Sequence, residues 1–278
     1  MHSESPRSPG NAGTVFFRIL GPLQATVDAR PVPLARNRQL ALLALLLTEA
    51  GKAVPLGRLV DAVWGEEPPV TADKQIQTCV WRLRKAFVKA GASAGLIETV
   101  RGGYLLRLPE DGLDTRLFER LRLTGRSRAA AGDAIGAVED YRAALALFQG
   151  PPLAGLESPA LEPVAAYWAE RRLALLEECL DLELAVGRHR ELVGELSLLV
   201  EEHPLREPLR WSLMAALYLS DRRADALAVY HAGRATLISH LGLDPCARLQ
   251  DLHRRIIAGD PVLPGAPARA EAQLSGAP

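Results

Sequence analysis

The chain has little cysteine, few aromatic residues and none of the short motifs that mark common catalytic or metal sites. Its three cysteines, among 278 residues, are scattered and odd in number, which excludes a disulfide framework and is typical of a reducing cytoplasm. The sequence contains no phosphate-binding glycine loop, hydrolase nucleophile motif or metal-ligating histidine pair. We therefore predict that the protein is not an enzyme and holds no cofactor and no metal.

The sequence also lacks an apolar run that could cross a membrane, which takes about 20 residues. Its most apolar stretch, ALLALLLTEA at 41–50, already contains Glu49. Residues 1–13 lack the hydrophobic segment of a secretory signal and are expected to be a disordered lead. Residues 261–278 are rich in Pro, Ala and Gly and are expected to be a flexible tail. We expect a cytoplasmic protein that lies on the nucleoid and does not meet a membrane.

The net charge of zero hides an asymmetry along the chain. Residues 14–108 carry 13 Lys and Arg against 7 Asp and Glu, a balance of +6. Residues 109–278 carry 19 against 25, a balance of −6. A basic first part joined to an acidic second part indicates that the first part meets an anion, while the second meets proteins or its own first part.

Hydrophobic patterning over residues 14–109 predicts a small sheet, three helices and a hairpin, in that order. The runs VFFRIL, LQATV and RPVPL are separated by turn residues, which predicts an antiparallel sheet. Helices are expected over 36–51, over 55–65, and from a cap at Thr71 or Asp73 to about Ala90. The segment LIETVRGGYLLRL then predicts a hairpin that turns at Gly102-Gly103. This order is that of a winged helix, a helix-turn-helix variant with an appended hairpin.

The third of these helices has one apolar stripe and one charged side. Its core positions are spaced 4, 3 and 4 residues apart and are Ile76, Val80, Leu83 and Phe87. At about 100° per residue the opposite side carries Lys74, Thr78, Arg82 and Lys85. Such a face is either an ordinary solvated surface or one that meets a polyanion, and the winged-helix order together with the basic balance favours DNA.

The candidate DNA contacts follow from the chemistry of these side chains. Lys74, Gln75, Thr78 and Arg82 form an outward ridge that can reach base edges in a major groove, since Arg and Lys pair with guanine and Gln with adenine. Arg84 and Lys85 are placed for phosphates, and Trp81 for sugar or a thymine methyl. In the hairpin, Arg101 can enter a minor groove or meet a phosphate, or the hairpin can be purely structural. Ahead of the first helix, Arg36 and Arg38 can touch phosphate or simply face solvent.

From 113 to 260 the sequence is rich in Leu and Ala and predicts a domain made almost wholly of helices. The pattern AVxxYxA at 137–143 returns as ALxxYxA at 226–232. Small residues at fixed places with one aromatic per helix allow antiparallel helices to pack closely, as in tetratricopeptide-like repeats. The predicted fold class is mainly α with a small β component, a winged helix over 14–109 followed by an all-α helical-repeat domain.

Taken together, several segments of residues 15–258 resemble one family, the Streptomyces antibiotic regulatory proteins, or SARPs. These proteins join an OmpR-type winged helix, the effector domain of two-component regulators, to a bacterial transcriptional activation domain. The segments that carry the resemblance include LVDAVWGEEPP, WRLRKAF, ETVRGGYLL, ALALFQGPPLAGL and LGLDPCARLQDLHRRI.

The resemblance implies a transcriptional activator of antibiotic biosynthesis genes. In the family, the winged helix binds direct repeats near promoters, and the protein recruits RNA polymerase with its principal sigma factor. Head-to-tail homodimers on the DNA are then expected. In relatives, the loop between the second and third helices meets the transcription machinery. The resemblance therefore implies a sigma-factor contact in the matching loop of this chain, at Gly65, Glu66, Glu67 and Pro68. The alternative is that this loop is only a connector. A competing hypothesis is a helical-repeat scaffold that binds a peptide or small effector, with the winged helix making only protein contacts.

Overall fold

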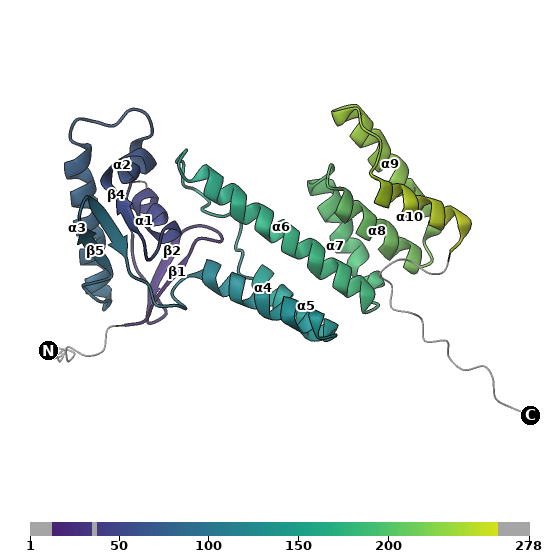
Figure 1. Cartoon of the computed structure of the whole chain (residues 1–278), viewed down its shortest axis with the longest axis horizontal. Helices are drawn as coiled ribbons and strands as arrows, with labels where there is room; N and C mark the ends of the chain where they lie inside the picture. The colour runs from purple at the N-terminus through teal and green to yellow at the C-terminus, as the bar shows by residue number, and fades with distance from the viewer. Residues whose placement is uncertain (1–12, 35–37, 261–278) are drawn as a thin grey trace, which may run out of the picture. The chain divides into compact units, whose positions relative to one another are not determined.

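The computed structural model describes residues 13–34 and 38–260, and its first part is a winged helix (Figure 1). Three strands, β1 (Val15–Arg18), β2 (Gln24–Val27) and β3 (Arg30–Pro31), form an antiparallel sheet in the order β1-β2-β3. Three helices follow, α1 (Arg38–Thr48), α2 (Leu56–Trp64) and α3 (Ala72–Ala90). The hairpin strands β5 (Ile97–Val100) and β6 (Gly103–Leu106) close the domain. The predicted order of sheet, three helices and hairpin is confirmed.

The apolar stripe of α3 is buried where the sequence predicts it. Ile76, Val80, Leu83 and Phe87 are each at most 1% exposed, and they join the same core as the sheet and α1. Phe17 of β1 packs edge-on against Phe87 with ring centroids 5.5 Å apart, which anchors the C-terminal half of α3 to the sheet. Of the two predicted caps, Thr71 occupies the N-cap position of α3 but its side chain makes no capping hydrogen bond, and Asp73 lies inside the first turn.

The hairpin differs from the prediction in the residues of its turn and in a third strand that pairs with it. Val100 pairs with Gly103, so the turn is Arg101-Gly102 rather than Gly102-Gly103, and Gly102 takes the left-handed φ of +79°. A strand that the sequence did not reveal, β4 (Ala53–Pro55), pairs with β6 in the order β4-β6-β5. A Cβ on Gly103 would lie 2.0 Å from the Val54 carbonyl oxygen, so this glycine allows β4 to approach.

Residues 114–258 form a series of helices, which confirms the predicted all-α class of the second part. Each aromatic of the repeated pattern is buried, with Tyr141 2% and Tyr230 7% exposed. A Cβ on Gly125 would lie 2.5 Å from Tyr141 Cε1, so a small residue lets this helix pair approach closely, as in a helical repeat. The helices are α4 (Asp114–Ala130), α5 (Ala134–Leu145), α6 (Glu162–Ala185), α7 (His189–Glu202), α8 (Glu207–Leu219), α9 (Arg223–Leu241) and α10 (Ala247–Ala258).

The chain divides into two compact units that do not follow the linear order of the sequence. One comprises residues 1–123 and 143–173, and the other comprises residues 124–142 and 174–278. Within the first unit, Leu153 and Leu161 belong to the winged-helix core, and the Ser158 hydroxyl donates to the Ala62 carbonyl at 2.7 Å. The predicted boundary between domains at 109–113 stays a prediction.

No helix of residues 13–34 and 38–260 is long and apolar enough to cross a membrane.

Candidate nucleic-acid interface

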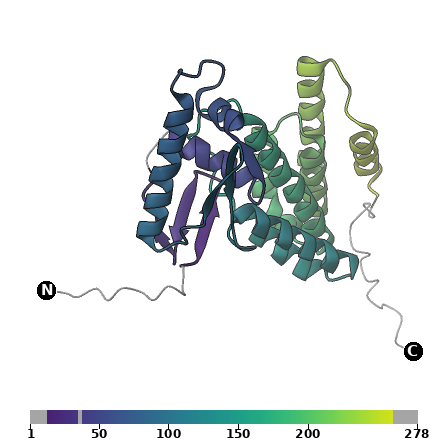
Figure 2. The same cartoon turned by 60° about the vertical axis from the view of Figure 1, so that its left-hand side comes forward.

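The side of α3 that faces away from the core is exposed along its length (Figure 2). Burial of the apolar stripe leaves Lys74, Thr78, Trp81 and Lys85 on the opposite side, at the helical spacing of 4, 3 and 4 residues. Arg82 is also exposed, next to this stripe. Trp81 is 58% exposed and adds an apolar ring to this face.

The cations of this surface have no carboxylate partner. Among the residues that the structure describes, the side chains of Lys74, Arg82, Lys85 and Arg101 form no ion pair and no hydrogen bond. Lys85 Nζ lies 5.0 Å from the centre of the Trp81 ring, a cation–π contact that leaves its charge uncompensated. Uncompensated charge of one sign on one exposed face attracts a polyanion.

Two polar residues of the predicted ridge are engaged within the protein. The Thr78 hydroxyl donates to the Lys74 carbonyl at 2.9 Å, so it offers lone pairs rather than its proton. The Gln75 side chain is half-buried and bonds at both ends of its amide, to Arg38 and to Thr71. Base reading by Thr78 and Gln75 stays a prediction.

Arg38, the first residue of α1, lies on one flank of α3. Its Nη1 donates to Gln75 Oε1 at 2.8 Å, and its guanidinium lies 5.3 Å from the centre of the Trp64 ring. Burial raises the pKa of the nearby Cys79 thiol, against the positive charges of Arg82 and Arg38, which both lie on this flank. Arg36, the other arginine predicted here, falls outside the residues that the structure describes.

Arg84 lies on the other flank and connects α3 to the wing. Its Nε donates to the Ile97 carbonyl and its Nη2 to Thr99 Oγ1, each at 2.9 Å. The guanidinium also lies 5.9 Å from the centre of the Tyr104 ring. These contacts hold the hairpin against α3, so the structure gives Arg84 a positioning role that the sequence did not indicate, and its predicted phosphate contact remains untested.

Arg101 stands at the exposed tip of the hairpin. It is the first residue of the Arg101-Gly102 turn, and the strands on either side pair through Val100 and Gly103. A hydrogen bond from the Leu56 N–H to the Gly102 carbonyl, 2.9 Å long, ties the tip to the start of α2. The wing therefore presents Arg101 from a backbone that is fixed at two places, and its groove or phosphate contact stays a prediction.

The loop between α2 and α3 is exposed and acidic. Gly65 ends α2 with a φ of +65°, and its N–H donates to the Asp61 carbonyl at 2.8 Å. Glu66, Glu67 and Pro68 follow as exposed residues, and Val70 is fully exposed. The loop leads directly into the N-terminal end of α3 (Figure 2), and it offers two exposed carboxylates and an exposed apolar side chain there. Its predicted contact with a sigma factor stays a prediction.

An exposed basic helix held between a hairpin wing and a flanking arginine defines a winged-helix transcriptional regulator. The family models agree with this class, since "Transcriptional regulatory protein, C terminal" matches residues 30–106 and "Bacterial transcriptional activator domain" matches residues 113–257. The chain belongs to the SARP family, whose members are transcriptional regulators and not enzymes.

Two relatives and a solved structure support this assignment. Regulatory protein AfsR of Streptomyces coelicolor is 40% identical over 93% of this chain, and regulatory protein DnrI of Streptomyces peucetius is 34% identical over 93% of this chain and 99% of its own length. The structure of Mycobacterium tuberculosis EmbR in complex with a low-affinity phosphopeptide matches with a TM-score of 0.86 and 36% identity, over 90% of this chain and 66% of that one. The chain spans only 26% of AfsR.

Proposed function

We propose that the chain is a sequence-specific DNA-binding activator that binds direct repeats near promoters and switches on antibiotic biosynthesis genes. The observation that carries the DNA-binding part is the set of four uncompensated cations on α3 and the wing tip, Lys74, Arg82, Lys85 and Arg101. A helix fits the major groove of B-form DNA, and the same placement brings the wing toward the neighbouring groove or backbone.

The proposed contacts divide by chemistry. Lys74 and Arg82 are donors that reach base edges, and guanine is the base with two acceptors in the major groove. Lys85 and Arg101 bind phosphates or the adjacent groove, which strengthens binding without selecting a sequence. Trp81 packs on sugar or on a thymine methyl group, because its exposed ring is apolar.

The DNA-binding proposal is tested by selection and anisotropy. A duplex is first recovered from a randomised library by repeated selection with the wild-type chain, and its affinity is compared with that of a scrambled duplex across a salt series. The Lys74→Ala, Arg82→Ala double variant should lose at least about 2 kcal/mol of binding free energy and discriminate the two duplexes less well. A control with the same loss of charge, Arg107→Ala, Arg254→Ala, should bind almost as the wild type.

Two outcomes would count against this proposal. If the wild-type chain binds weakly and without regard to sequence, the groove-reading role of α3 is wrong. If the control variant loses as much affinity as the double variant, the binding depends on total charge rather than on this face. Either result would favour the helical-repeat scaffold as the main function.

We further propose that the acidic loop recruits RNA polymerase through its principal sigma factor. Glu66 and Glu67 are exposed carboxylates next to the DNA-reading helix, where a basic segment of a promoter-bound sigma factor can meet them. Each contact needs only a small free energy, because two ligands on one DNA raise each other's occupancy. The Glu66→Ala, Glu67→Ala variant should keep its DNA affinity and lose activation in a transcription assay with holoenzyme. Unchanged activation would overturn the sigma contact alone.

Direct repeats in the target imply a head-to-tail arrangement of two protomers. Two copies that read repeats in the same orientation are related by translation along the DNA rather than by a two-fold axis. Half-sites about one helical turn apart would put both α3 helices on one side of the duplex. Selected duplexes that contain inverted repeats instead would contradict this arrangement.

A further inference from the structure

The amide of Gln75 has both of its ends occupied within the protein. Its Oε1 accepts the Arg38 Nη1 hydrogen bond at 2.8 Å, and its Nε2 donates to Thr71 Oγ1 at 3.0 Å. A glutamine that reads adenine needs the same two groups, the oxygen for adenine N6 and the nitrogen for N7. These two contacts use one lone pair of the oxygen and one N–H of the nitrogen, so the amide could meet a base only in the orientation that Arg38 and Thr71 impose on it.

The orientation of this amide is fixed by the chemistry of Arg38. A guanidinium has only N–H donors, so the amide group that faces it must be the oxygen. The hydroxyl of Thr71 can accept as well as donate, which suits the amide nitrogen on the other side. Turning the amide by 180° would set donor against donor at Arg38, so Gln75 keeps one arrangement.

The Arg38 guanidinium is held from two different helices. Gln75 of α3 accepts one of its N–H groups, and the face of the guanidinium lies over Trp64, the last residue of α2. Within residues 13–34 and 38–260, Arg38 forms no ion pair with a carboxylate. Among the described residues, the other four of its five N–H donors have no hydrogen-bond partner, and they lie in a planar fork that matches two oxygens of a phosphate.

We propose that Gln75 is a positioning residue for Arg38 and not a base reader, and that the pair presents the Arg38 guanidinium to one DNA backbone phosphate. Holding a long side chain in its binding geometry before DNA arrives removes the entropy cost of ordering it on binding. The pair also links the start of α1 to the first turn of α3, so a phosphate held there fixes how far α3 enters the groove. This inference rests on the proposed DNA-binding function.

The experiment is a double-mutant cycle on the duplex recovered by selection. Binding is measured by anisotropy for the wild type, Arg38→Ala, Gln75→Ala and the double variant, on the selected and the scrambled duplex. Arg38→Ala should weaken binding to both duplexes by about tenfold and lower the salt slope by about one. Gln75→Ala should weaken both duplexes as well, and it should have almost no further effect once Arg38 is absent.

The phosphate itself provides a readout that a merely structural role of Gln75 would not change. Neutral methylphosphonates are placed one at a time along the selected duplex, and one of them should weaken wild-type binding by about tenfold. That substitution should have no effect on Arg38→Ala, and its effect should shrink in Gln75→Ala. Gln75→Met keeps the length of the side chain but lacks its amide, and it should behave as Gln75→Ala does. Agreement between the two variants would show that the effect comes from the lost amide and not from a folding defect.

The controls separate the possible failures. Arg107→Ala removes one positive charge at the base of the hairpin, and its methylphosphonate profile should match the wild type. If Gln75→Ala relaxes the preference at one base pair, or weakens binding further in the Arg38→Ala background, Gln75 reads a base and the positioning role is overturned. If the wild type shows no preference for its selected duplex, the proposed function itself has failed, and this inference fails with it.

Discussion

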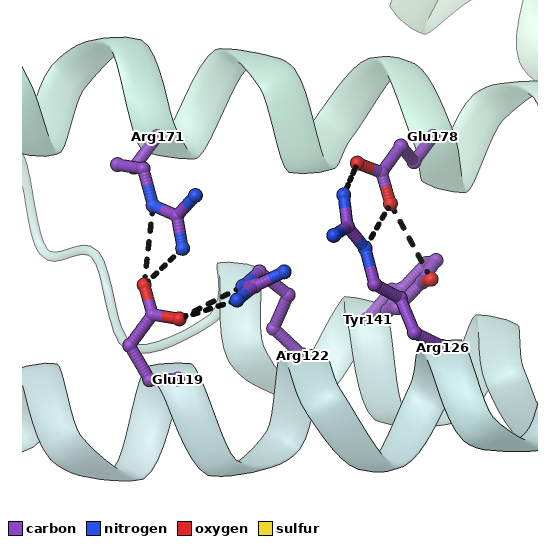
Figure 3. A network of polar contacts seen from close by, with 6 residues as sticks. All are labelled: Glu119, Arg122, Arg126, Tyr141, Arg171 and Glu178. Atoms are coloured by element: carbon purple, nitrogen blue, oxygen red, sulfur yellow. Dashed lines mark hydrogen bonds and ion pairs between the residues drawn. The ribbon is translucent and has the colours of Figure 1, made fainter.

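The arginines of the second, all-α part of the chain (residues 114–258) and the cations of α3 in the winged helix differ in what surrounds them. Figure 3 shows two groups of charged side chains between α4 and α6, one around Glu119 and one around Glu178. Arg122 Nε donates to Glu119 at 2.9 Å, and Arg171 binds the other oxygen of the same carboxylate through Nε at 3.1 Å. In the other unit, Arg126 binds both oxygens of Glu178.

These pairs change the acid–base properties of their members. Burial opposes ionisation of Glu119, but hydrogen bonds from Arg171 and Arg122 outweigh it and lower its pKa. The Glu178 carboxylate raises the pKa of the Arg126 guanidinium through their hydrogen bond. In both groups the carboxylate holds its cations by hydrogen bonds within the protein: Glu178 matches Arg126 one to one, and Glu119 is shared between Arg122 and Arg171.

The comparison teaches that pairing, rather than the number of basic residues, marks the anion-binding surface. The acidic part of the sequence carries 19 Lys and Arg, more than the 13 of the basic part. Many of those 19 are matched with carboxylates of the same helix, a neighbouring helix or a loop, whereas Lys74, Arg82 and Arg101 have no carboxylate partner among the described residues. Charge that the fold leaves uncompensated is available to DNA.

The largest effect is expected where a paired charge is most buried. The Glu183 side chain is 6% exposed and pairs with Arg142 and, at 3.5 Å, with Arg188. Glu183→Gln keeps the shape but leaves Arg142 with one fewer counter-charge, so the free energy of unfolding should fall by about 3 kcal/mol. Urea unfolding measures this loss, and DNA affinity at a temperature where the variant is folded should not change.

Glu195 provides the matched control for that substitution. It binds the same Arg142 at 2.8 Å, but its side chain is 38% exposed. Glu195→Gln should cost less than about 1 kcal/mol, because water screens and replaces an exposed pair. Equal losses for the two variants would show that burial does not decide the strength of these pairs.

Asp114 extends the comparison to a carboxylate held mainly by backbone groups. It is 1% exposed, and its Oδ2 accepts the N–H groups of Ile19 and Leu20, each at 2.9 Å. Burial raises its pKa from 3.8 to about 6, against these hydrogen bonds. Because the folded pKa is raised, this group contributes full stability below pH 3.8 and loses it as the pH rises through about 6.

The expected size of this loss is about 3 kcal/mol between pH 4 and pH 7. Asp114→Asn stays neutral and keeps one acceptor, so it should remove this part of the pH dependence. Asp114→Ala should be less stable at every pH, because both backbone N–H groups lose their partner. The free energy of unfolding is measured across this pH range for the wild type and both variants. If its dependence on pH is the same in Asp114→Asn as in the wild type, other groups cause that dependence.

Helical and strand periodicity predicted most of the fold because those signals are local. The stripe from Ile76 to Phe87 fixed the face of α3 that is buried, and with it the exposed positions of Lys74 and Lys85. The strand β4 escaped prediction because three residues that end in a proline carry no alternating pattern. The sequence placed the hairpin turn one residue too late because it assigned both glycines to the turn. Gly103 instead lies in β6, where the close approach of the Val54 carbonyl requires a glycine.

The contacts that organise the candidate site could not be read from the sequence. Arg38 and Gln75 are 37 residues apart, and Arg84 and Thr99 are 15 apart. Each pair depends on how the helices and the hairpin pack in three dimensions, which periodicity does not report. The sequence therefore predicted which side chains are exposed, but not which of them are already bonded to one another.

Arg84 tests whether a cation beside α3 serves the fold or the DNA. Arg84→Ala removes two hydrogen bonds to the hairpin, so we expect a loss of about 1–2 kcal/mol in the free energy of unfolding. Hydrogen exchange at the amides of β5 should become faster. Arg84→Lys keeps the charge but not the fork of donors, so it should not rescue the wing. Full rescue by lysine would favour a simple phosphate contact.

The smallest effect on stability is expected at Lys85. Its side chain is exposed and forms no ion pair or hydrogen bond among the described residues, only a cation–π contact with Trp81, so Lys85→Ala should change the free energy of unfolding by less than about 0.5 kcal/mol. The same variant should weaken DNA binding several-fold and lower the salt slope by about one, because a phosphate loses its partner. Arg126→Ala should leave DNA affinity unchanged, because it removes no DNA contact, and should lower the free energy of unfolding by less than about 1 kcal/mol, because its pair with Glu178 is exposed. If the two variants lowered stability and DNA affinity to the same extent, pairing inside the protein would not predict which cations are available to the ligand.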